Sequence, residues 1–215
     1  MLSRARRSAV ALCALSILAL FALPAAARAG VIVVDISGGG EFTSLPAAIA
    51  AAVDGDTVLI RPGDYTGQAT KIEIIGRGLT IAADGTGPVF VPPISIGNAF
   101  FPKRTVLRGL TAHSGLGMTL GPGLSVMSGN VLAEGCDFLG HPGSVFTGTL
   151  PGAPGVQVLF GSVVLKDCVA QGGKGFDSEP GHNLSSPGGP GVDAFLGPAL
   201  IYGCLLYTSP SPRDS

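Results

Sequence analysis

The chain has 215 residues and a net charge of −1, and it contains 34 glycines and 17 prolines. So many helix-breaking residues exclude a fold of long helices, and a hydrophobic content of 46% excludes a disordered chain. The near-zero net charge provides no excess of positive charge for binding nucleic acid or an anionic membrane. One domain built from short strands and many turns fits this length and composition.

Residues 1–29 have the features of an export signal. Three arginines among the first seven residues precede an apolar run (9–23), and an A-x-A cleavage pattern follows at Ala27–Ala29. The apolar run is shorter than the roughly 20 residues that a membrane span requires. We therefore expect a mature chain from Gly30 that is secreted, periplasmic or on the cell surface, with no membrane span after cleavage.

The start of the mature chain predicts a strand, a short helix and a second strand. Val31–Val34 form an apolar strand, and Thr43 or Ser44 can cap the helix that follows. The apolar positions expected on the buried side of this helix are Leu45, Ala48, Ile49, Ala52 and Val53. Thr57–Ile60 then form the next strand. An amphipathic helix in this position is suited to cover the open hydrophobic end of a repeat protein.

Three later segments align without a gap: Pro122–Cys136, Pro154–Cys168 and Pro190–Cys204. Each opens with Pro-Gly, closes with cysteine and carries a glycine at the same internal position. Apolar residues alternate with others on both sides of that glycine, which predicts two short strands with one buried face. Successive segments begin 32 and 36 residues apart, which is typical of one coil of a solenoid with loops of variable length.

The repeat also accounts for the three cysteines of the mature chain. Equivalent positions stack in neighbouring coils, so Leu110, Cys136, Cys168 and Cys204 are expected to form one inward-facing ladder. Buried free cysteines behave as small hydrophobic residues, and parallel in-register neighbours suit disulfide geometry poorly. The sequence contains no C-x-x-C spacing, which would indicate a metal site.

The segment from Gly40 to Tyr65, which includes GEFTSL and AAVDGDTVLIRPGDY, resembles the entry of pectate lyase-like right-handed parallel β-helix proteins, and pectin methylesterases open similarly. The resemblance implies an all-β solenoid, a right-handed parallel β-helix over residues 30–204 with a short N-terminal capping helix. Enzymes of that superfamily act mostly on acidic polysaccharides, through calcium-binding carboxylates with a basic residue or through clustered aspartates. The sequence motifs of those lyases and esterases are absent here, so the resemblance is specific for the fold and not for the reaction.

Equivalent outward positions of the three segments hold Ser125, Gln157 and Asp193. They form no column of carboxylates, so no catalytic residue is assigned. The most polar segment is the loop from Gln171 to Asp193, which is either a solvated connection or a binding loop. Its candidate binding residues are Lys174, Asp177, Glu179, His182 and Asp193. Asp177 and Glu179 could supply oxygen ligands to calcium, and no other cofactor is expected.

The last residues, Leu205–Ser215, change abruptly to LLYTSPSPRDS. This string resembles translated sequencing-adapter read-through, and the alternative is a natural Ser/Pro-rich tail. We expect the repeat to be truncated near Cys204. Three hypotheses remain. The first is an exported non-catalytic β-helix that binds an extracellular polysaccharide or another surface molecule through its loops. The second is the N-terminal part of a polysaccharide lyase or pectin esterase whose catalytic coils are missing, and the third is a purely structural surface spacer.

Overall fold

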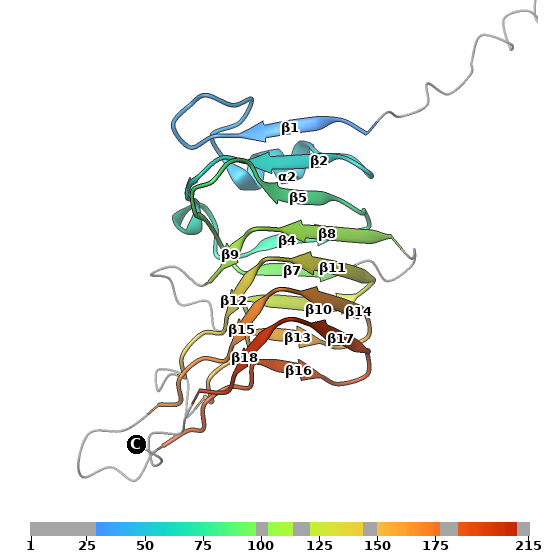
Figure 1. Ribbon diagram of the computed structural model, residues 1–215. Coiled ribbons are helices and arrows are strands. Elements are labelled where there is room, and N and C mark those ends of the chain that lie inside the picture. The colour runs from blue at the N-terminus through green and yellow to red at the C-terminus, as the bar shows by residue number, and fades with distance from the viewer. Residues whose placement is uncertain (1–28, 98–102, 114–120, 144–149, 177–184, 210–215) are drawn as a thin grey trace, which may run out of the picture.

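The structure is a computed structural model that describes residues 29–97, 103–113, 121–143, 150–176 and 185–209. These residues form one α-helix, one 3-10 turn and strands that belong to three parallel sheets. The prediction of a mostly β protein of stacked parallel strands is confirmed. Figure 1 shows the strands stacked in rows along one long axis. No helix in the described part of the chain is long and apolar enough to cross a membrane.

We call the three sheets A, B and C. Sheet A contains β1 (Val31–Val34), β2 (Thr57–Ile60), β5 (Thr80–Ala83), β8 (Arg104–Arg108), β11 (Asn130–Glu134), β14 (Ser162–Lys166) and β17 (Ala199–Tyr202). Sheet B contains β3 (Gly63–Asp64), β6 (Val89–Val91), β9 (Thr111–Ala112), β12 (Asp137–Leu139), β15 (Val169–Gln171) and β18 (Leu205–Tyr207). Sheet C contains β4 (Ile72–Ile75), β7 (Ile94–Gly97), β10 (Leu124–Ser128), β13 (Val156–Val158) and β16 (Val192–Ala194).

From β2 onward the chain visits sheets A, B and C in turn, so one coil contributes one strand to each sheet. The pairing register agrees with the sequence alignment of the repeats, because Leu124 pairs with Val156 and Val156 with Val192. β10 and β11 flank Gly129, which has a φ of +96° that most side chains disfavour. β18 continues the stack in sheet B, with Leu205 paired to Val169.

The connection from sheet A to sheet B is a two-residue turn in four successive coils. The first residue of the turn is Gly109, Gly135, Asp167 or Gly203, with φ between 53° and 64°. Glycine adopts this left-handed conformation without strain, and Asp167 is the exception among the described residues. The second residue of each turn is the ladder residue Leu110, Cys136, Cys168 or Cys204.

Inward-facing side chains of the three sheets form a single hydrophobic core. Leu124, Val126 and Phe138 have no exposed surface, and Leu110, Cys136 and Cys168 expose 1% or less. Cys204 is partly buried against the same core. Cys136, Cys168 and Cys204 are free thiols, so they contribute to the core as hydrophobic residues.

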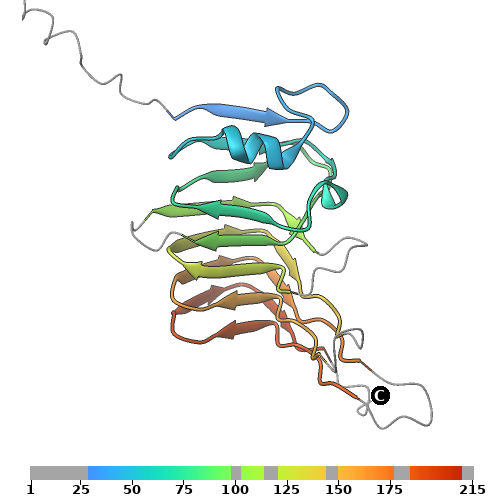
Figure 2. The ribbon, with the colours of Figure 1, turned by 180° about the vertical axis from the view of Figure 1, so that it is seen from behind.

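The helix α2 (Leu45–Ala51) packs against the first coils, where it contacts β1, β2 and β4 (Figure 2). Ser44 is the N-cap, and its hydroxyl accepts a hydrogen bond from the Ala47 amide at 3.4 Å. Ala48 and Ala52 are buried as expected. The expectation for Val53 is wrong: its side chain is 54% exposed, because the helix ends at Ala51 and the chain turns away.

Candidate ligand-binding face

The outer face of sheet C carries a column of polar side chains on five neighbouring strands. The residues are paired in register from one strand to the next: Glu73, Ser95, Ser125, Gln157 and Asp193. In β4, β7, β10 and β13 each of them lies between two buried residues, so its side chain faces outward. We call this set the polar column.

Few interactions within the protein occupy the polar column. Glu73 forms an ion pair with Lys71 at 2.7 Å, where both side chains are about half exposed. The Gln157 amide donates a hydrogen bond to the Asp193 carboxylate at 3.4 Å. The repeat alignment had identified only Ser125, Gln157 and Asp193. Glu73 and Ser95 lie in coils that lack the Pro-Gly and cysteine markers, so the strand register was needed to find them.

Large apolar side chains are exposed next to the polar column, where the strands of sheet C turn toward sheet A. Ile75, Met127, Phe160 and Phe195 are exposed by 45% to 71%. These fractions are far above those of core residues, and isolated exposure of one such residue would be unremarkable. They recur at this corner in four of the five coils, whereas β7 ends at Gly97, and we call this set the apolar ridge.

A bundle of extended backbone segments projects from the other end of the sheet C strands. It consists of residues 140–143, 150–155, 172–176 and 185–191 from the connections between sheets B and C (Figure 1). The segments are joined by backbone hydrogen bonds of 2.8 Å from Ala153 to His141, from Gly173 to Ala153 and from Gly189 to Gly173. We call this bundle the glycine arm.

Glycine is required where the segments of the arm touch. A Cβ atom on Gly173 would lie 1.9 Å from the His141 carbonyl oxygen, and one on Gly189 would lie 2.2 Å from the Ala153 carbonyl oxygen. Both neighbours are backbone atoms, which no side-chain rotation can move aside. The described ends of the Gln171–Asp193 loop are therefore held by backbone contacts to other coils.

Two cavities flank the glycine arm. The first, of about 370 Å³, reaches the polar column at Gln157 and is also lined by His141, Leu150 and Pro154. The second, of about 450 Å³, lies against the outer face of sheet B and is lined by residues that include Phe90, His113, Gln171 and Lys174. The Phe90 and His113 rings pack edge to face with centroids 5.7 Å apart.

The structure separates the binding residues that were expected to act together. Asp193 belongs to the polar column, whereas Lys174 lines the cavity beside sheet B. Asp177, Glu179 and His182 lie outside the described residues, and with them both calcium candidates. Within the described ranges no group of three or more His, Cys, Asp or Glu side chains could hold a metal ion.

The three thiols of the cysteine ladder lie next to one another on the inner side of the stacked coils. The hydrogen bond with the Cys136 thiol lowers the pKa of Cys168. The same contact, together with burial, raises the pKa of Cys136. The Cys168 amide donates to the Cys204 sulfur at 3.3 Å. No cysteine lines either cavity, so the ladder has no route to a substrate bound there.

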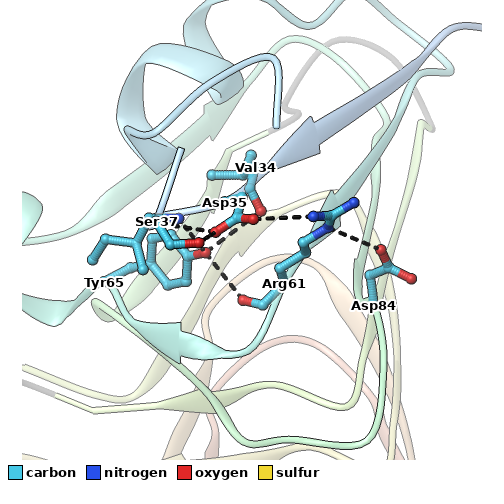
Figure 3. A network of polar contacts seen from close by, with 7 residues as sticks. Val34, Asp35, Ser37, Arg61, Tyr65 and Asp84 are labelled. Atoms are coloured by element: carbon cyan, nitrogen blue, oxygen red, sulfur yellow. Dashed lines mark hydrogen bonds and ion pairs between the residues drawn. The ribbon is translucent and has the colours of Figure 1, made fainter. Parts of the chain in front are cut away.

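A buried polar network joins the first two coils (Figure 3). The Asp35 carboxylate accepts hydrogen bonds from the hydroxyl and amide of Ser37 and pairs with Arg61 at 3.1 Å. These contacts, led by the Ser37 hydroxyl, lower the pKa of Asp35. The fully buried Tyr65 hydroxyl accepts from the Ile36 amide and donates to the Arg61 carbonyl at 3.0 Å. Because these groups bind one another across β1, β2 and the segments that follow them, the network stabilises the packing of the first coils.

The outer face of sheet A carries a ladder of opposite charges. Arg108, Glu134 and Lys166 are paired in register on three neighbouring strands. Glu134 forms ion pairs with Arg108 at 2.7 Å and with Lys166 at 3.8 Å. The hydrogen bond from Arg108 lowers the pKa of Glu134. Within this ladder Glu134 offsets part of the positive charge of Arg108 and Lys166, whereas the outward residues of the sheet C strands include no basic residue.

Comparison of the chain with protein-family models, with curated proteins and with solved structures found no match.

Proposed function

We propose that the protein is an exported, non-catalytic, right-handed parallel β-helix that binds glycan through the outer face of sheet C. The helical architecture is supported by the order in which the chain returns to each sheet once per coil. Crossovers between parallel strands of a sheet are right-handed in about 98% of known cases. The proposed cap is α2, whose apolar side packs on the first coils.

The observation that carries the proposed ligand is the pairing of the polar column with the apolar ridge. A sugar ring has hydroxyl groups around its edge and apolar C–H groups on its faces. Serine hydroxyls, the glutamine amide and carboxylates can donate to or accept from such hydroxyl groups. Exposed phenylalanine rings such as Phe160 and Phe195 provide large apolar contact at small conformational cost. A structural spacer would have no use for this arrangement.

The spacing of the carboxylates supports binding without catalysis. Glu73 and Asp193 are four strands apart, which separates them by about 19 Å at the usual strand spacing. The paired carboxyl groups of glycoside hydrolases lie roughly 5 to 9.5 Å apart. The rungs between these two residues of the column hold only Ser95, Ser125 and Gln157, so this face offers no acid–base pair.

Binding of the mature protein to a panel of soluble polysaccharides, measured by affinity electrophoresis, tests the proposal. Phe195→Ala is expected to weaken binding roughly five- to tenfold, because an aromatic contact contributes about 1 kcal/mol or slightly more. Tyr202→Ala is the matched control, since Tyr202 is an exposed aromatic residue on sheet A of the same coil. Equal loss in both variants, or binding that is insensitive to Phe195, would refute this site.

A further inference from the structure

The distribution of basic residues distinguishes the sheet C face from the rest of the molecule. The outward residues of its five strands include no lysine or arginine. Lys71, next to β4, is paired with Glu73. Two further basic residues lie in connections from sheet C to sheet A and bind the segment after α2. Arg77 donates to the Ala52 carbonyl at 2.7 Å, and Lys103 pairs with Asp54 at 3.1 Å.

The other basic residues of the coils lie on other parts of the molecule, and Arg104 is the first residue of β8 in sheet A. Arg108 and Lys166 pair with Glu134 on sheet A. Arg61 belongs to the network around Asp35, and Lys174 lines the cavity on the sheet B side of the glycine arm. The polar column therefore combines three uncharged rungs with a carboxylate at each end, and the Glu73 end already has a cation partner.

Asp193 is the other carboxylate of the column, and within the described part of the chain its side chain accepts a hydrogen bond from the neutral Gln157 amide and forms no ion pair. A polyanionic chain laid along the column would bring its carboxylates toward Asp193 with no lysine or arginine on the strands to compensate. Like charges placed together are a common means of rejecting a wrong partner. An uncharged glycan meets no such repulsion and can hydrogen-bond to all five rungs.

We propose that the sheet C face selects an uncharged glycan and that Asp193 acts against glycans rich in uronic acid. This inference rests on the proposed glycan-binding function and specifies its ligand class. Its physical basis is the charge of the face, so the selectivity depends on ionic strength. Screening over about 10 Å at 0.1 M salt reduces repulsion between exposed charges.

The test compares binding of the mature protein to a neutral galactomannan, to polygalacturonate and to chitosan, first in low salt and then in 0.5 M NaCl. We expect the neutral polymer to bind at least tenfold more tightly than polygalacturonate in low salt, with a smaller ratio in high salt. Asp193→Lys is expected to strengthen polygalacturonate binding. Glu41→Lys, which makes the same charge change in the loop between β1 and α2, is expected to leave the ratio unchanged.

The outcomes separate the two proposals. Tighter binding of polygalacturonate or chitosan than of galactomannan overturns the ligand class while the glycan-binding function stands. An equal response to Asp193→Lys and Glu41→Lys overturns the role of Asp193. Absence of binding to every polymer, with both variants folded by circular dichroism, overturns the proposed function itself.

Discussion

Replacement of Gly173 by alanine is expected to open the glycine arm. The added Cβ would lie 1.9 Å from the His141 carbonyl oxygen, against the 3.4 Å at which ordinary van der Waals contact begins. The His141 carbonyl carbon, at 2.4 Å, and the Pro142 nitrogen, at 2.8 Å, block the same direction. The two backbone segments must therefore separate, because neither neighbour is a flexible side chain.

The separation affects hydrogen bonds as well as packing. Gly173 donates to Ala153 and accepts from Gly189, both at 2.8 Å. Each bond contributes about 0.5–1.5 kcal/mol, and overpacking a well-packed site costs about 1–3 kcal/mol. If both bonds are lost, we expect the free energy of unfolding to fall by roughly 2–6 kcal/mol. If the arm opens locally and the coils stay folded, the loss is smaller and appears as faster amide exchange in residues 150–155.

Urea denaturation followed by circular dichroism measures the global effect, and hydrogen exchange measures the local one. Gly121→Ala is the matched control, because Gly121 lines a cavity beside the same arm and a Cβ there would meet nothing within 4 Å. The control is expected to change stability by less than about 0.5 kcal/mol. A Gly173→Ala variant with wild-type stability and wild-type exchange in the arm would show that the backbone contacts described above do not form.

Three further predictions concern stability. Asp167→Gly is expected to raise the free energy of unfolding by about 0.5–1 kcal/mol in urea denaturation, because Asp167 holds a φ of +53° that glycine adopts without strain; a destabilised variant would contradict this. Phe138→Ala is expected to lower it by about 3–5 kcal/mol, since the ring is fully buried, and a loss below 1 kcal/mol would mean that the ring is not in the core. The folded-state pKa of Asp35 lies below its ordinary value of 3.8, so the stability that the ionised carboxylate contributes is present above about pH 4 and is lost as the pH falls through the lowered pKa. The wild-type protein should therefore lose more stability between pH 5 and pH 2 than Asp35→Asn does. Parallel pH profiles of the two proteins would refute this prediction.

The repeat pattern predicted the stacking of coils at the level of single residues. A solenoid places equivalent positions of successive repeats on neighbouring strands, so an alignment within one sequence is also a list of pairs in space. The alignment of Val131 with Val163, for example, is the pairing found in sheet A. Strand ends were predictable for the same reason, since the central glycine marks the bend. The end of α2 was not, because the apolar pattern alone continued to Val53.

The candidate site was only partly predictable. Asp193 was identified from the sequence both in the polar loop and, by alignment with Ser125 and Gln157, as an outward position, but its place at the end of a five-residue column was not. Glu73 and Ser95 belong to coils whose sequences differ from the repeat, so no alignment placed them beside Ser125. Lys174 was selected with Asp193 because the two are close along the chain. The glycine arm instead directs Lys174 to the sheet B side.

The sequence by itself determined the composition of the three aligned repeats: where the strands fall, which side chains face inward and where the central glycine marks a bend. These properties are local, since they follow from alternation along a strand and from the conformational freedom of single residues. Only the tertiary structure decided which outward residues of the other coils lie on one surface with Ser125, Gln157 and Asp193. The connections between coils vary in length, so the positions of Glu73, Ser95 and Asp193 relative to one another depend on strand register. The sequence spacing of these residues does not contain that register.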